Sequence, residues 1–251
     1  MITDIQKASL LKRIAAGLFD AILIGIFAVG FAWMLTSILD YNSHHAAFQE
    51  GLSRYEQQFG VDFDADLSNL TEEQQITYEA AYQAVNADKE MSRTLSIMMN
   101  LTIICTTFGI FLAVFLLEFV IPVILKNGQT IGKKIFAIGV VRIDGVQLTN
   151  LQLFVRTVLG KFTIEIMIPV YIIIMIVFNA IGIVGILVLG GIMLLELILL
   201  IATQTNSLIH DSMAGTVAVD IASQMIFRTT EDLIAYKKKI HAEQAARSIY
   251  K

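Results

Sequence analysis

The sequence predicts an all-α membrane protein with four transmembrane helices, an extracytoplasmic, partly helical loop and a cytoplasmic C-terminal helix. Hydrophobic residues make up 56% of its 251 residues, charged residues make up 16%, and the mean hydropathy is +0.69. Such a composition is far more apolar than that of a soluble domain of this length. Three apolar runs are each long enough to cross a bilayer, and the third is long enough to cross it twice. Lysine and arginine are unevenly distributed among the connecting segments, which indicates an orientation.

Residues 1–40 comprise the N-terminus and the first predicted spanning helix. The apolar run is too long for the hydrophobic region of a secretory signal, so we interpret it as a retained helix. Asp20 lies inside this run, where a charged side chain costs at least about 2.5 kcal/mol. Arg13 precedes it on the same helix face, and Gly17 between them leaves room for another segment to approach. We therefore expect Asp20 to have polar partners, Arg13 among them.

Residues 41–93 form a predicted acidic loop outside the bilayer. From Asp40 to Arg93 the chain carries eleven acidic side chains and three basic ones. Thr71 and Gln74 have the spacing of a capping box, so part of the loop is expected to be helical. Four acids have some of the spacing of a calcium-binding loop, but Leu67 stands where its sharp turn needs glycine. A solvated acidic loop is therefore favoured over a calcium site.

Residues 94–125 are the second predicted spanning helix, interrupted only by Glu118 and by Pro122 near its end. Residues 126–161 follow as a cytoplasmic basic connector, in which six lysines and arginines oppose a single acid. Asp144-Gly145 lies between two short β-prone runs and suits a tight turn, which predicts a hairpin within the connector.

An interfacial turn is predicted at the start of the connector. Its glycines and lysine lack the spacing of a phosphate-binding P-loop, and they follow a membrane helix rather than a strand. We expect the glycines to permit close approach and the lysines to contact lipid phosphate groups. The residues of this turn are Gly128, Thr130, Gly132, Lys133 and Lys134.

Residues 162–205 are too long for one helix and supply the third and fourth predicted spans, with a reversal at Asn179 to Gly182. Residues 206–251 form a cytoplasmic segment that contains His210 and Asp211 and ends in a basic tail helix. The acidic loop holds three lysines and arginines, whereas the connector and the tail hold six each. This asymmetry predicts a cell-membrane protein with both termini in the cytoplasm.

Acidic residues at similar depths in the predicted spans suggest a shared polar layer that faces the interior of the helix bundle. Three hypotheses for this layer stay open: an ion-pair network that fixes helix registry, a path for an ion or proton, and a binding site for a lipid head group or partner helix. His210 could relay protons to Asp211 or form a local hydrogen bond. The candidate residues are Arg13, Asp20, Glu118, Arg156, Glu165, Glu196, His210 and Asp211, with Lys161 as a further base.

These spaced elements resemble the RDD family of membrane proteins, which is named for one arginine and two aspartates. By position, the resemblance assigns those three residues to Arg13, Asp20 and Asp211. It covers most of the chain except the acidic loop, which looks longer than the usual family connection, and the basic tail. It implies a small helical membrane domain, and transport of ligands, with sodium/proton antiport proposed for some members. The resemblance rests on Arg13, Asp20, Gly128–Lys134, Val140–Arg142, Arg156 and His210–Val217.

Two functions follow as hypotheses. The first is transport of a small cation or proton through a polar core built on Arg13, Asp20 and Asp211, in a chain that could self-associate to enclose the path. The second is a non-transporting scaffold or accessory subunit whose loop and tail bind partner proteins. The chain has no hydrolytic motif, one cysteine and no basic module with interleaved aromatics. We therefore expect no enzyme activity, no cofactor, no metal and no nucleic-acid partner.

Overall fold

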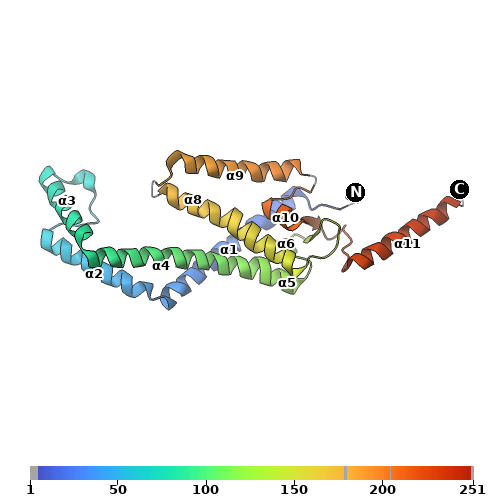
Figure 1. The fold of residues 1–251 in the computed structure, drawn as a ribbon, viewed down its shortest axis with the longest axis horizontal. Helices are drawn as coiled ribbons and strands as arrows, with labels where there is room; N and C mark the ends of the chain where they lie inside the picture. The colour runs from blue at the N-terminus through green and yellow to red at the C-terminus, as the bar shows by residue number, and fades with distance from the viewer. Residues whose placement is uncertain (1–4, 178–179, 204, 250–251) are drawn as a thin grey trace. The chain divides into compact units, whose positions relative to one another are not determined.

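The computed structural model describes residues 5–177, 180–203 and 205–249 (Figure 1). The chain divides into two compact units. Unit 1 combines Met1–Ile26 with Phe111–Lys251, and unit 2 is Phe27–Ile110.

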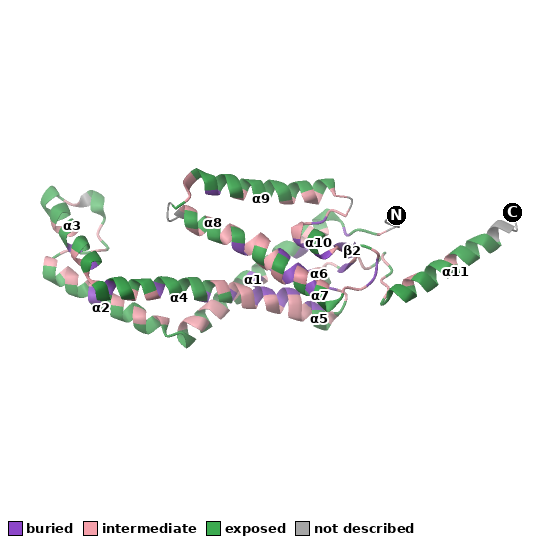
Figure 2. Cartoon of the chain, in the orientation of Figure 1, coloured by how far each residue is buried: buried purple, intermediate pink, exposed green. Residues whose placement is uncertain are grey.

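Four helical segments of the described residues are long and apolar enough to cross a membrane, which confirms the predicted fold class. Large apolar side chains are exposed along them, including Leu187 and Met193 on the fourth segment, whose surface is almost wholly exposed in Figure 2. Exposed apolar surface of this extent is expected to face lipid. The segments are Leu10–Ile38, Lys89–Leu125, Asn150–Ile176 and Gly182–Ala202.

The third spanning segment begins earlier than predicted, at Asn150 rather than residue 162. Thr149 and Gln152 form a capping box that starts a helix there, with the Gln152 N–H donating to Thr149 Oγ1 at 3.2 Å. The end of the predicted connector therefore belongs to the span. The reversal before the fourth span matches the prediction, since α8 ends at Val177 and α9 begins at Gly182, although Asn179 itself lies outside the described residues.

Two spanning segments change from α-helix to π-helix within unit 1. The second runs as α4 (Lys89–Val114), η2 (Phe115–Val120) and α5 (Ile121–Leu125), where η2 is a π-helix. The third runs as α7 (Asn150–Phe154), the π-helix η3 (Val155–Met167) and α8 (Ile168–Val177). π-Helical turns are rare and are often found at functional sites.

Pro122 gives a physical reason for the wide turn in η2. Proline has no backbone N–H and clashes with the carbonyl four residues earlier, which here belongs to Glu118. The hydroxyl of Thr157 on η3 donates instead to that carbonyl oxygen, at 2.9 Å. The same interaction ties the second and third spanning segments together at the level of Glu118.

A two-stranded antiparallel sheet pairs β1, at Ile138–Arg142 within the connector, with β2 at Thr216–Asp220. The predicted hairpin forms only in part, because Val141 and Gln147 make a single antiparallel bridge across the turn, whereas the longer ladder of β1 is with β2. The turn at Gly145 does form, because its N–H donates to the Arg142 carbonyl at 2.9 Å, but β1 pairs with β2. Burial explains the choice, since Val141 packs in one apolar cluster with Val217 and Val219 of β2.

The sheet positions two short helices that carry functional candidates. Helix α6 (Ile131–Ile135) leads into β1, and α10 (Ile209–Ala214) leads through Gly215 into β2. Pairing of the strands thus places the start of the connector and the His210–Asp211 segment in the same part of unit 1.

Unit 2 holds the acidic loop, which is largely helical. It contains α2 (Tyr41–Phe59), the short 3-10 helix η1 (Leu67–Asn69) and α3 (Glu72–Ala87). The predicted capping box at Thr71 is confirmed, with both reciprocal hydrogen bonds to Gln74 present. The predicted tail helix is α11, at Thr230–Ile249.

Candidate functional site: a buried charge network

Asp20 of α1 (Leu10–Ile38) is 4% exposed and is held by the start of the connector. The Thr130 hydroxyl donates to Oδ2 at 2.5 Å, and the Gly132 N–H donates to Oδ1 at 2.8 Å. Lys133 Nζ lies 3.9 Å from Oδ2. Only glycine allows this approach, because a Cβ at residue 132 would lie 2.5 Å from the Ala16 carbonyl oxygen.

Glu118 of η2 is fully buried and faces three cationic side chains. Lys161 Nζ forms a direct ion pair with Oε1, while Lys133 Nζ and Arg156 Nη1 lie 3.7 and 3.9 Å from Oε2. Oε2 accepts no hydrogen bond from the described residues. The negative charge of Glu118 is therefore balanced by one direct ion pair, to Lys161, and by two longer-range attractions, to Lys133 and Arg156.

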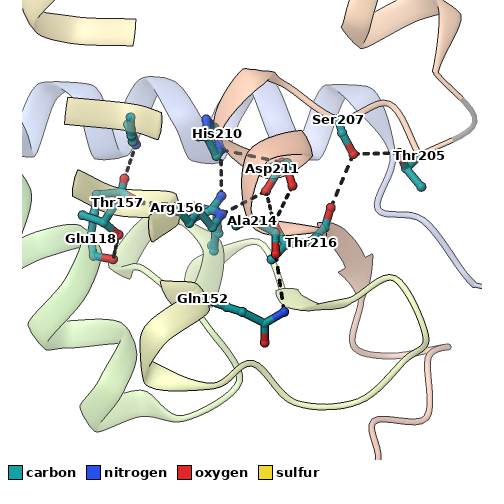
Figure 3. Close-up of polar contacts among 12 residues, drawn as sticks. Glu118, Gln152, Arg156, Thr157, Thr205, Ser207, His210, Asp211, Ala214 and Thr216 are labelled. Carbon is teal, nitrogen blue, oxygen red and sulfur yellow. Dashed lines mark hydrogen bonds and ion pairs between the residues drawn. The ribbon is translucent and has the colours of Figure 1, made fainter. Parts of the chain in front are cut away.

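Asp211 of α10 is 1% exposed and lies at the centre of Figure 3. Arg156 Nε donates to Oδ1 at 2.9 Å, the Thr216 hydroxyl donates to the same oxygen at 2.8 Å, and Arg13 Nη2 lies 3.5 Å from Oδ2. Burial alone would raise the pKa of Asp211, but the charge and hydrogen bond of Arg156 act together with the other neighbours, Arg13 among them, and hold that pKa well below its usual range.

His210 contacts Arg156 (Figure 3) and also joins this cluster to Glu165 of η3. Arg156 Nη2 lies 2.8 Å from Nε2, and Nδ1 lies 2.7 Å from both carboxylate oxygens of Glu165. Arginine can only donate, so we assign the proton to Nδ1, from which it bonds to Glu165. Gly160 permits the contact, because a Cβ there would lie 2.6 Å from the His210 Cα.

Glu196 of α9 differs from the other candidate acids. Both of its carboxylate oxygens are buried and have no hydrogen-bond partner within the described parts of the chain. Glu165 and then Asp211 are the acids that act most strongly on its charge, and the Ile209 backbone N–H also acts on it, although none of these contacts has hydrogen-bond geometry. No lysine or arginine forms an ion pair with it among the described residues.

The ion pairs form one continuous network. Lys133 connects Asp20 to Glu118, and Arg156 connects Glu118 to Asp211. Arg13 joins the network through Asp211. Helices far apart in the sequence are thus joined through alternating charges. Burial also lowers the pKa of the Lys133 ammonium, although Glu118 beside it acts in the opposite direction.

Two expectations for the first helix were wrong. Arg13 does not pair with Asp20 but with Asp211, and it also donates to the Thr205 carbonyl at 3.4 Å. Residues on one helix face project toward different neighbouring segments when they stand two turns apart. Gly17 is not a helix contact either, since a Cβ there would have no atom within 4 Å.

The expected interfacial turn is largely internal, which corrects our assignment of it to lipid phosphate groups. Thr130, Gly132 and Gly128 are buried, and Lys133 points to Asp20 and Glu118. Of this set only Lys134 is exposed. Asp20 and Glu118 are buried, so each needs a polar or basic partner, and Lys133 and the Gly132 N–H serve as such partners. Lipid head groups lie in water and need these partners less.

A half-open cavity of about 490 Å³ adjoins the network in unit 1. Four cationic side chains line it, together with two acids, His210 and a majority of apolar side chains. The charged lining residues are Arg13, Lys133, Arg156, Lys161, Glu165 and Asp211.

Sequence reasoning missed Thr157 and Thr216, and it placed Thr130 and Lys133 at the lipid interface rather than in this site. Thr130, Thr157 and Thr216 each contact a residue of the network, and Lys133 bridges two acids. The one available signal was Thr130, whose position three residues before Lys133 is that of a helix N-cap. Nothing in the spacing of the other residues indicated their partners.

Comparison with known protein families identifies the family of this chain. The sequence matches the RDD family over residues 7–215, which includes every residue of the network. No curated protein and no solved structure matches the chain. With four spanning helices and a family match over most of its length, this membrane protein belongs to the RDD family.

Proposed function

We propose that this protein moves a small cation or a proton across the membrane, and that Glu165, His210 and Glu196 form the exchanging site. The observation that carries the proposal is the state of Glu196, whose two oxygens are buried without a hydrogen-bond partner in the described chain. An isolated carboxylate is costly to bury unless it takes up a proton or a cation. Intramembrane acids of this kind commonly mark ion and proton paths.

Glu165 and His210 supply the second half of the exchanging site. Two neighbouring carboxylates repel each other when both are charged, so one proton or small cation between Glu165 and Glu196 is favourable. His210 holds Glu165 through its backbone N–H at 2.8 Å and through Nδ1 at 2.7 Å. The other ring nitrogen of His210 contacts Arg156 at 2.8 Å, so His210 connects Glu165 with the rest of the network.

The remaining acids have a different role in this proposal. Asp20, Glu118 and Asp211 are each close to at least one lysine or arginine, and Asp20 and Asp211 also accept hydrogen bonds at normal lengths. Such neutralised acids have little tendency to bind a further cation. They hold the helices in register around the exchanging site.

We also propose that both termini lie in the cytoplasm of a cell-membrane protein. Support comes from the excess of lysine and arginine in the tail and connector over the acidic loop. Labelling of a cysteine introduced at exposed Ala235 should occur in inverted vesicles and not in intact cells. Labelling in intact cells would reverse the orientation.

The transport proposal is tested by reconstituting the full chain in proteoliposomes with a pH gradient and a sodium or potassium gradient. Wild type should dissipate the gradient, whereas E196Q should abolish the flux and E165Q should reduce it strongly. E79Q, an exposed acid of α3, is the matched control and should retain wild-type flux. Wild-type flux in folded E196Q would contradict the proposal.

A scaffold is the second candidate, and the observation that favours it is the complete pairing of Asp20, Glu118 and Asp211. Such a network could serve only to hold helices together. A scaffold should co-purify with a stable partner that is lost when residues 42–89 are deleted. Flux by the reconstituted chain alone favours transport instead.

A further inference from the structure

We propose that the cavity in unit 1 binds an anionic phospholipid of the surrounding bilayer. Its phosphate lies at Arg13, and the part of an acyl chain nearest the head group lies along α1. This inference goes beyond transport and does not depend on it, because it concerns binding to the cavity wall. The cavity is the one of about 490 Å³ that adjoins the charge network.

The apolar part of the cavity fits an acyl chain. Ile14 and Leu18 of α1, Ile166 of η3 and Leu200 of α9 are among its lining residues. Three spanning segments thus contribute to one wall, and these segments expose large apolar side chains of the kind that faces lipid. The volume is within the range of known small-molecule sites.

The polar part of the cavity is suited to a phosphate. Four cationic and two acidic side chains line it, whereas the other two acids of the network, Asp20 and Glu118, are not in the lining. Those two acids pair with Lys133 and Lys161 from outside the cavity surface. Arg13 differs from those lysines, because its acidic contact, Asp211 at 3.5 Å, is already paired with Arg156 at 2.9 Å.

Arg13 is the principal head-group ligand that the structure assigns. Its side chain is 10% exposed and lines the cavity, yet its two contacts are long, at 3.4 Å to the Thr205 carbonyl and 3.5 Å to Asp211. Normal N–H···O bonds are about 2.7–3.2 Å long, so the guanidinium keeps strong donors available. Arginine binds phosphate through two parallel hydrogen bonds.

A phospholipid fits this arrangement better than a free phosphate ion. A free ion would satisfy Arg13 but leave the apolar wall uncovered, whereas a lipid fills both parts at once.

Gly17 offers a steric test that leaves the charges intact. It lines the cavity, and a Cβ at this position would meet no atom within 4 Å. G17L should therefore fold and fill the cavity with its own side chain. G25L is the matched control, because Gly25 lies on the same helix, also has open space around a Cβ and does not line the cavity.

The experiment measures binding of dioleoyl phosphatidylglycerol to the purified full chain in detergent, by native mass spectrometry and by the shift in thermal unfolding. Wild type and G25L should bind phosphatidylglycerol at least tenfold more tightly than phosphatidylcholine with the same chains. G17L should lose this preference. R13Q should lose it too, while K12Q should retain it, because Lys12 pairs with Asp220 outside the cavity.

The alternative outcomes are distinct. Equal binding of the two lipids, or full binding by G17L, would overturn the proposal even if R13Q does not fold. Saturable protection by inorganic phosphate at the strength of phosphatidylglycerol would assign the site to a free anion and would also overturn it. Loss of flux in E196Q with intact lipid binding leaves this proposal standing, since the two measurements report different residues.

Discussion

The candidate acids of the functional site in unit 1 fall into two groups with opposite surroundings. Asp20, Glu118 and Asp211 are nearly inaccessible and lie beside lysine or arginine. Glu196 has two buried oxygens without a hydrogen bond, and the nearest acid is Glu165, whose hydrogen-bond partner is His210. The two groups are called the paired acids and the unpaired site below.

The difference teaches that burial of a carboxylate alone does not identify a transport residue. A paired acid loses an essential contact when its charge is removed, because its lysine or arginine is then buried alone. An acid without a base loses little when it is neutralised. Stability and flux should therefore respond in opposite ways in the two groups.

The largest loss of stability is expected for R156M. Arg156 contacts both Glu118 and Asp211, so its removal leaves two buried carboxylates less compensated. Breaking a buried pair in this way costs ~3–5 kcal/mol of unfolding free energy. The measurement is reversible unfolding in mixed micelles.

R142M is its matched control. Arg142 pairs with Asp144 at 2.7 Å, but both side chains are about one-third exposed, so the loss should stay below about 1 kcal/mol. Equal losses in the two variants would show that the buried network contributes no more than a surface pair.

A smaller loss is expected for G132A. The added Cβ would lie 2.5 Å from the Ala16 carbonyl oxygen and 2.8 Å from Asp20 Oδ1, so α6 must shift away from Asp20. Overpacking costs about 1–3 kcal/mol. G190A has no atom within 4 Å of its added Cβ and should instead be neutral or slightly stabilising in the same unfolding assay.

The contribution of Asp211 to stability should depend on pH. The pKa of Asp211 is held well below its usual range in the folded chain. Its stabilising contribution is therefore complete above about pH 4 and is lost as the pH falls toward the folded-state pKa, by up to ~1.4 kcal/mol per pH unit. Unfolding free energies between about pH 5 and pH 3 should fall more steeply for wild type than for D211N, and parallel slopes would contradict this assignment.

The smallest effect on stability is expected for E196Q, within about 1 kcal/mol of wild type, because no ion pair is broken. E118Q makes the same chemical change where three cationic side chains surround the acid, and it should be strongly destabilised. Comparable losses for the two variants in mixed micelles would remove the distinction between the paired acids and the unpaired site.

The sequence predicted the spans and the membership of the site better than its internal contacts. Apolar length was enough for four spanning helices, and local spacing was enough for the capping box at Thr71. Asp20 and Thr130 are 110 residues apart, and such contacts depend on which helices meet. Spacing on one helix shows only a shared face, which is why Arg13 was expected beside Asp20.

The local departures from regular structure were also outside the reach of the sequence pattern. Pro122 marked a break near the end of the second span, but its effect is the π-helix that contains Glu118. The strand partner of β1 is fixed by burial against Val217 and Val219, far along the chain, and not by the nearby turn. Periodicity reports one segment at a time, whereas these features arise from pairs of segments.

The most direct test of the division between the two groups is cation or proton flux per folded molecule in proteoliposomes, compared for D20N and E196Q. Asparagine at residue 20 can still accept the Gly132 N–H, so D20N that folds should keep most of the wild-type flux. E196Q should fold and carry none. Wild-type flux in E196Q together with loss of flux in folded D20N would contradict the account.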